Sequence, residues 1–102
     1  METLIANRPV DVNEQGYMTD MNQWDKEVAY DMAEAEGINL TDRHFEVLDY
    51  LRSEQAKGTA LSIRKVGKSG VVDIKEFYSL FPEGPLKKAS KIAGIPKPAS
   101  CI

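Results

Sequence analysis

The chain has 102 residues, of which 42% are hydrophobic and 28% charged, and its formal net charge is −3. These values are typical of one small soluble domain with a modest core and leave no room for a second domain. No apolar run is long enough to span a bilayer, and no signal-peptide pattern opens the sequence. We therefore expect a cytoplasmic protein without a membrane partner.

The charge is unevenly divided along the chain. Residues 1–57 carry 13 acids and 5 bases, a balance of −8, whereas residues 58–102 carry 3 acids and 8 bases, a balance of +5. The basic half carries the only cysteine, Cys101, one residue from the end of the sequence. Positive charge together with this thiol indicates an anionic partner or substrate. One cysteine and one histidine, His44, exclude an internal disulfide and argue against a zinc site, so we expect no metal and no cofactor.

The first twenty residues read as short extended pieces around a turn. A turn is predicted at 13–16, and the flanking strand-forming residues are Leu4, Ile5, Val10, Val12 and Tyr17. This pattern predicts a small antiparallel meander that must pack on helices to be stable.

Two clear helices follow the meander. The first, over 21–37, has Asp20 or Asn22 as its cap, Gly37 at its end, and an apolar face of Trp24, Val28, Met32 and Ala35. The second begins at the cap Thr41 and ends at Gly58. Its apolar stripe is Phe45, Leu48, Leu51 and Val47.

Residues 60–82 predict a short helix, a glycine-bounded turn and a further helix that Pro82 stops. The apolar residues of the further helix are Ile74, Phe77, Tyr78 and Phe81. A last helix has Pro85 in its first turn and Gly94 after its end. The prediction is a mostly helical α+β fold: one domain over 1–94, and a flexible, extended C-terminal arm over 95–102.

The turn between these two helices contains Gly67-Lys68-Ser69, but it is not a phosphate-binding loop. That loop needs a glycine at position 62, which is Ser62, and a preceding strand. The outline is that of a helix-turn-helix, with Arg64, Lys65, Lys68 and Lys75 nearby. Asp73 and Glu76 on the second helix would repel phosphates, so a packing unit is favoured and nucleic-acid binding is kept as an alternative.

The remaining aromatic and histidine side chains have structural interpretations. His44 lies in the first turn of its helix with no catalytic partner near it in sequence, and this favours capping or packing over catalysis. Trp24, Tyr78 and Phe81 lie at helical spacings and are assigned to the core.

Cys101 stands one residue from the carboxyl end, after Pro96 and Pro98. A polyproline-like segment rises about 3.1 Å per residue, so the thiol could stand roughly 15 Å from the body of the protein. Lysines nearby, Lys91 and Lys97, favour the thiolate, which is the reactive form of cysteine. The alternative is an incidental cysteine at a chain end.

Several stretches of the sequence resemble one family. The matching stretches are "LFPEGP", "KIAGIPKP" with the penultimate cysteine, "GYMTDMNQWDKEVA" and "INLTDRHFEVLDYLR". They are similar to the family that includes DsrC, the gamma-subunit-like partner of dissimilatory sulfite reductase, and TusE, a sulfur carrier in tRNA thiolation. The resemblance implies a small meander sheet against helices, a helix-turn-helix-like pair and a mobile C-terminal arm.

The resemblance also implies a role for the arm. Cys101 would accept sulfur as a persulfide and pass it to a partner, without turnover of a small substrate by the chain alone. The implied partners are the donor and acceptor proteins of a relay, namely a TusBCD/DsrEFH-like complex, a thiouridylase or sulfite reductase, with nucleic acid involved only indirectly. The residues expected to guide and dock the arm are Lys91, Gly94, Pro96, Lys97 and Pro98.

The sequence departs from the sulfite-reductase-linked members at one position. Those members carry a second cysteine eleven residues before the penultimate one, and here that position is Ser90. TusE-like carriers also lack it, so we favour a natural single-cysteine carrier over an introduced Cys-to-Ser change. A DsrC-like subunit or regulator associated with sulfite reductase stays open as an alternative.

Overall fold

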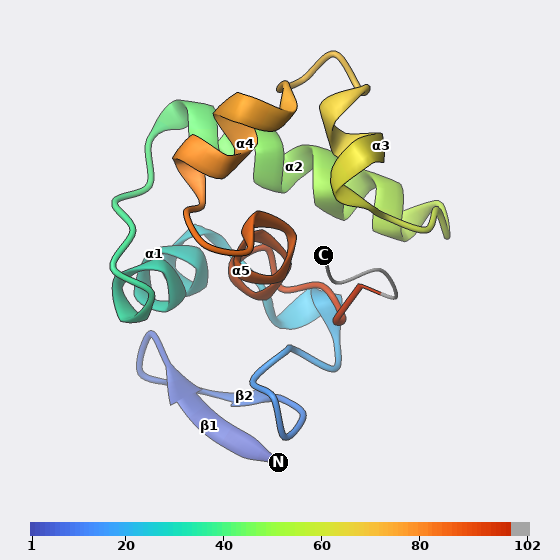
Figure 1. Cartoon of the computed structure of the whole chain (residues 1–102). Coiled ribbons are helices and arrows are strands. Elements are labelled where there is room, and N and C mark those ends of the chain that lie inside the picture. The colour runs from blue at the N-terminus through green and yellow to red at the C-terminus, as the bar shows by residue number, and fades with distance from the viewer. Residues whose placement is uncertain (99–102) are drawn as a thin grey trace.

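The computed structural model describes residues 1–98. A two-stranded antiparallel hairpin lies below an array of helices, and α5 runs through the middle of that array (Figure 1). The elements in chain order are β1 (Glu2–Ile5), β2 (Arg8–Asp11), the 3₁₀ turn η1 (Met21–Gln23), α1 (Lys26–Ala35), α2 (Asp42–Ala56), α3 (Ile63–Gly67), α4 (Ile74–Leu80) and α5 (Pro85–Ile92). The predicted α+β class is confirmed.

The hairpin turn lies at Ala6 and Asn7. Both residues have left-handed backbone conformations, with φ of 53° and 62°, as a tight two-residue hairpin turn requires. The predicted turn at 13–16 also forms, but it closes only a single bridge between Val12 and Met18. The turn at Ala6 and Asn7 was not predicted from the sequence, because alanine seldom adopts this conformation. Here the Ala6 N–H donates to Asp31 on α1, at 2.6 Å.

The first helix starts later than predicted. Asp20 caps η1, where it accepts from the Asn22 N–H, and Asp25 caps α1 by accepting from the Val28 N–H. The predicted caps for α1 were therefore wrong, because Trp24 adopts an extended backbone and separates the two turns. The buried face of α1 is Val28, Ala29, Met32 and Ala33, whereas Ala35 is exposed.

The second helix begins as predicted, at Thr41. The Thr41 side chain accepts from the His44 N–H, and His44 Nδ1 accepts from the Thr41 N–H at 3.1 Å, which completes a capping box. His44 Nε2 lies 2.9 Å from the Leu80 carbonyl oxygen, so the ring also ties α2 to the end of α4. The structural interpretation of His44 is confirmed.

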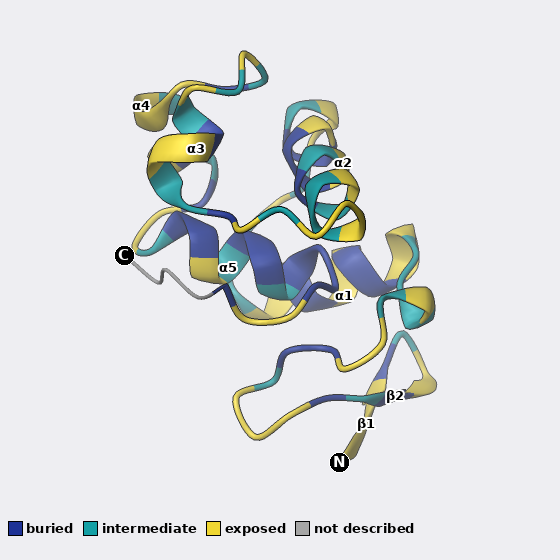
Figure 2. Ribbon diagram, turned by 90° about the vertical axis from the view of Figure 1, so that its right-hand side faces the viewer, coloured by how far each residue is buried: buried dark blue, intermediate teal, exposed yellow. Residues whose placement is uncertain are grey.

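The core surrounds α5, which contacts α1, α2 and α4. Figure 2 shows the buried faces of the helices turned toward this centre. The α5 region contributes the fully buried side chains Leu86, Ala89, Ile92 and Ile95. No helix among residues 1–98 is both long and apolar enough to cross a membrane.

The two helices of the α3–α4 pair differ from expectation at one aromatic residue. Phe77 and Phe81 are fully buried and pack edge to face, with ring centroids 5.9 Å apart. Tyr78 is 44% exposed, so its assignment to the core was wrong. Of the seven residues of α4 only Phe77 is buried, and Phe81 follows directly as the C-cap of the helix.

Candidate functional site

Cys101 lies outside the described residues, and the described part of the candidate site is the chain that leads to it. That chain consists of α5 and residues 93–98. We name residues 92–95 the arm base. Beyond it, Pro96 and Lys97 are exposed, whereas Pro98 is buried.

The arm base turns sharply at Gly94. This residue has φ of 70° directly after the end of α5, as predicted. A Cβ added to it would lie only 2.6 Å from Cδ1 of Trp24. Glycine is therefore required here twice, by the left-handed backbone and by the close approach of the indole.

The next residue still belongs to the body of the protein. Ile95 is fully buried, and its N–H donates to the Ser90 carbonyl oxygen at 3.1 Å. This contact closes the helix end and places an apolar side chain in the core. Ile95, which the sequence assigned to the flexible arm, is thus packed in the core, and the division of the chain at Gly94 stays a prediction.

Two side chains from other segments bind the last carbonyl groups of α5. The Trp24 Nε1–H donates to the Ile92 oxygen at 2.7 Å, and Arg52 Nη1 donates to the Ala93 oxygen at 2.8 Å. Arg52 Nη2 also donates to the Met21 oxygen at 3.0 Å. These contacts satisfy carbonyl groups that a helix end leaves unpaired, and they attach the arm base to η1 and to α2.

Trp24 and Arg52 also contact each other. The guanidinium carbon lies 4.3 Å from the centroid of the indole ring, a cation–π geometry. Burial lowers the pKa of Arg52, although an arginine stays protonated at neutral pH. Sequence reasoning missed both roles. Its only available signal was an arginine directly beside the buried Leu51 of α2.

Ser90 faces the interior of the helical array. The residue is fully buried, and its Oγ has no hydrogen-bond partner among the described residues. Its backbone carbonyl is the one that accepts from Ile95. Ser90, where the resemblance implies a second cysteine in some family members, therefore holds a hydroxyl in an apolar setting.

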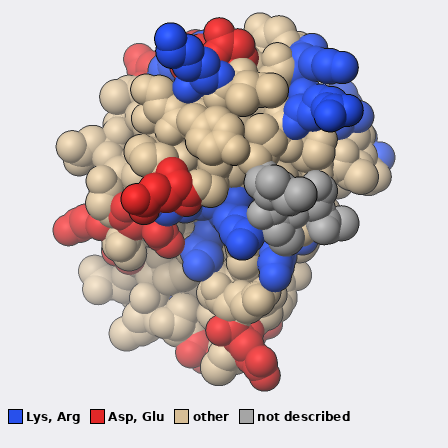
Figure 3. Space-filling model, viewed as in Figure 1, with Lys and Arg blue, Asp and Glu red and all other residues tan. Residues whose placement is uncertain are grey.

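Basic side chains gather over α5 in the middle of one face of the molecule (Figure 3). Lys87, Lys88 and Lys91 line a hollow of about 210 Å³ together with Tyr17, Glu36 and Glu83. Lys91 Nζ lies 4.0 Å from a Glu36 oxygen and 5.2 Å from the Tyr17 ring centroid. The charge of Lys91 is thus partly offset by Glu36 at the end of α1, and the predicted docking role of this lysine stays a prediction.

The α3–α4 pair has the outline of a helix-turn-helix, but its charges are poorly placed for reading DNA. The bases Arg64, Lys65 and Lys68 belong to the first helix and its end. On the second helix, Lys75 lies between the acids Asp73 and Glu76.

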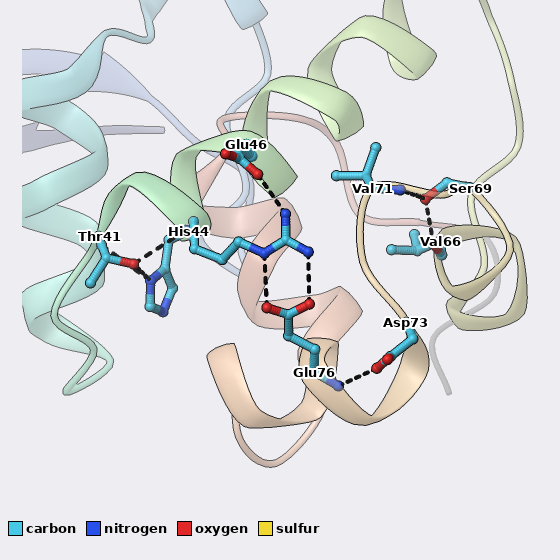
Figure 4. Close-up of polar contacts among 9 residues, drawn as sticks. Thr41, His44, Glu46, Val66, Ser69, Val71, Asp73 and Glu76 are labelled. Atoms are coloured by element: carbon cyan, nitrogen blue, oxygen red, sulfur yellow. Dashed lines mark hydrogen bonds and ion pairs between the residues drawn. The ribbon is translucent and has the colours of Figure 1, made fainter.

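Glu76 is paired with a neighbouring helix at the protein surface. Figure 4 shows its carboxylate bound by a side chain from α2. That side chain is Arg43, whose Nε and Nη2 donate to Glu76 at 2.8 and 2.7 Å. The hydrogen bonds from Arg43 lower the pKa of Glu76. The pair therefore serves to pack α4 on α2. Among residues 1–98, no three His, Cys, Asp or Glu side chains are grouped to hold a metal ion.

Comparison with known proteins gives a consistent result. Residues 4–102 match the family model described as DsrC like protein. Sulfurtransferase TusE of Yersinia pseudotuberculosis serotype I (strain IP32953) is 40% identical over 103 residues, which cover 93% of this chain and 95% of that protein.

Solved structures agree over the full length. The oxidized gamma-subunit of the dissimilatory sulfite reductase (DsrC) from Archaeoglobus fulgidus is 32% identical, with a TM-score of 0.82 and all of both chains covered. Allochromatium vinosum DsrC is 33% identical, with a TM-score of 0.79 and the same coverage. Since sequence and structure both match over nearly the whole chain, this chain belongs to the DsrC-like family.

Proposed function

We propose that the chain is a sulfur-relay carrier that accepts sulfur as a persulfide on Cys101 and passes it to a partner protein. The observation that carries this proposal is the similarity, over 93% of the chain, to a protein named sulfurtransferase TusE. The only cysteine, at the penultimate position, is the one group in the sequence suited to hold sulfane sulfur.

The proposed reaction needs no external oxidant. The Cys101 thiolate attacks the outer sulfur of a donor persulfide, a new S–S bond forms, and the donor leaves as a thiolate. In the second step a thiolate of the acceptor attacks the outer sulfur of the Cys101 persulfide and releases Cys101 as a thiolate. The sulfur atom moves twice by the same exchange, and the electrons balance at each step.

The described residues support a carrier with one reactive thiol. Ser90 cannot form a disulfide with Cys101, so the persulfide would not be lost to an internal second cysteine. The arm base is bound by Trp24 and Arg52, which gives the segment carrying Cys101 a fixed starting point. We infer that Gly94, Pro96 and Pro98 direct the arm from that point, and that Lys97 attracts acidic partner surfaces.

Intact-mass spectrometry tests the proposal directly. The reduced chain, incubated with a low-molecular-weight persulfide, should gain the mass of one sulfur atom, and dithiothreitol should remove it. Cys101→Ser should show no gain while its thermal unfolding stays unchanged. A Cys101 thiol that is demonstrably free yet gains no sulfur would contradict the carrier function.

A second candidate is a DsrC-like subunit that associates with sulfite reductase. The observation that favours it is the similarity to the A. fulgidus gamma-subunit over the whole of both chains. Binding of the chain to purified sulfite reductase in size-exclusion chromatography would support it. An absence of binding, together with persulfide loading, would leave the relay function alone.

A further inference from the structure

The two outer edges of the β1–β2 hairpin differ in whether their outward backbone groups are hydrogen bonded. On the edge of β2, Pro9 has no N–H to offer. The Asp11 N–H donates to the Gln23 side chain at 2.7 Å, and its carbonyl accepts from Gln23 Nε2 and from the Thr19 N–H, both at 3.1 Å. This edge is therefore closed to any additional strand.

The edge of β1 is open. The register pairs Leu4 with Pro9 and Glu2 with Asp11. Since the Val12 N–H donates to the Met1 oxygen, Leu4 and Glu2 occupy the alternate positions whose N–H and C=O groups point away from β2. Within residues 1–98, these backbone groups have no hydrogen-bond partner. Figure 1 shows no other segment drawn along this side of β1.

A groove of about 320 Å³ accompanies the open edge. One wall consists of Thr3, Leu4 and Ile5 of β1, and the facing wall includes Met32 and Ala35 of α1. Most of the groove surface is apolar. Leu4, which is among the lining residues, is 72% exposed. An extended chain laid along β1 would find backbone partners beside it and an apolar slot for alternate side chains.

Charge indicates what the incoming segment would carry. Asp31 and Glu36 border the groove, and Glu2 lies at the start of the open edge. The one base that lines the groove, Lys91, lies 4.0 Å from Glu36 and offsets its charge, so the remaining negative charge is that of Asp31 and Glu2. A second copy of this chain would bring a second Glu2 and a net charge of −3 against the same surface. A basic partner is the complementary one.

We propose that β1 and the groove beside α1 bind an extended segment of a partner protein, which adds a third strand to the hairpin. The segment carries apolar residues at alternate positions and Lys or Arg at its ends. Among residues 1–98, the residues that define this surface lie outside the arm base. It would allow a partner to be held while the arm is engaged elsewhere.

The test uses the full chain and a fluorescein-labelled peptide, Lys-Val-Thr-Val-Thr-Val-Lys, which contains no cysteine. Fluorescence anisotropy of the labelled peptide should show saturable binding to the chain. The dissociation constant should lie below about 1 mM, the weak range expected for a short strand addition. In the complex, hydrogen exchange of the Glu2 and Leu4 amides should slow, since these groups become hydrogen bonded. A peptide with Glu at both ends should bind at least about tenfold more weakly at low salt.

Two backbone changes distinguish strand addition from apolar contact alone. Leu4→Pro removes the outward N–H without removing a hairpin bond, and it should weaken binding about tenfold, whereas Leu4→Ala keeps the N–H and should weaken it less. N-methylation of the peptide valines should abolish binding to the unaltered protein. Because this change is made in the peptide, its result does not depend on whether Leu4→Pro folds.

Three results would overturn the proposal. They are no saturable binding, binding that tolerates both backbone changes, and a concentration-dependent dimer that Leu4→Pro abolishes. The last would assign the edge to a second copy of the chain. Because the peptide has no thiol, failure here leaves the persulfide result untouched, and failure of persulfide loading leaves this test untouched.

Discussion

The arm base and the α3–α4 pair are both short segments attached to the core, but they are held by different kinds of contact. In the α3–α4 pair the polar contacts are mostly local. Ser62 and Asp73 cap helices by accepting from residues three positions later, and Ser69 bonds to Val66 and Val71. In the arm base, the partners of Ile92 and Ala93 lie 68 and 41 positions away in sequence.

This difference in contacts indicates which segment depends on the rest of the fold. A local cap forms wherever its few residues adopt the turn, and its loss affects one helix. The arm base exists only when η1, α2 and α5 are all in place. We therefore expect substitutions there to cost more than chemically matched substitutions in the α3–α4 pair.

The largest loss of stability is expected at Gly94, and Gly70, which also has a left-handed backbone conformation, is its control. Gly94→Ala should lower the free energy of unfolding by about 3 kcal/mol, because the strained backbone and the overlap with Trp24 both contribute. Gly70→Ala, in the α3–α4 turn, has φ of 86° and nothing within 4 Å of the added Cβ. It should cost about 1 kcal/mol. Urea denaturation measures both, and equal losses would contradict the comparison.

The next largest loss of stability is expected from replacing Arg52, and Arg43, also on α2, is its control. Arg52→Met should lower the free energy of unfolding by about 2 kcal/mol, because two carbonyl groups lose a charged donor. Arg43→Met should cost less, since Arg43 and Glu76 are each 38% exposed and solvent screens their attraction. Thermal unfolding of the two variants is the measurement. A larger loss for Arg43→Met would reverse the order.

A smaller effect, of opposite sign, is expected at Ser90. Ser90→Ala removes a buried hydroxyl without a partner and should raise the free energy of unfolding by about 1 kcal/mol. The control is Ser79→Ala on the exposed face of α4, where only the difference in helix propensity of about 0.5 kcal/mol applies. If Ser90→Ala destabilises the chain, the hydroxyl has a role that its position does not explain.

The smallest effect should be seen on acidification. The pKa of Glu76 is lowered in the folded chain, so its contribution to stability is present above its ordinary pKa of 4.5 and is lost as the pH falls through the lower folded value. The arm base uses carbonyl acceptors that do not titrate. Hydrogen exchange should therefore show α4 amides losing protection below pH 4.5 before those near Gly94, and Glu76→Gln should remove this pH dependence.

Features encoded by neighbouring residues could be predicted from the sequence. Thr41 as a cap, Gly37, Gly58 and Gly94 as helix ends, and Pro85 in a first turn all appear as expected. Each depends on the conformational preference of one residue within a few positions of its partner. The class of fold and the α3–α4 pair followed from the same signals.

Features that depend on distant partners could not be predicted. Nothing near Arg52 in sequence indicates the carbonyl groups of Met21 and Ala93, which meet only after three segments pack together. Burial of Ile95 and exposure of Tyr78 likewise depend on which helix lies opposite. The left-handed pair Ala6 and Asn7 was missed because an alanine gives no signal of such a turn.

The indole at the arm base has a practical consequence. Trp24 is the only tryptophan, and it stacks on a guanidinium and donates to the last turn of α5. Its emission spectrum is therefore a reporter for this one junction, in a protein where no other indole contributes. With Cys101 as the only thiol, an acceptor dye can be attached without altering any residue. The native chain thus already contains a donor and an attachment point for measuring energy transfer between the body and the arm when a partner binds.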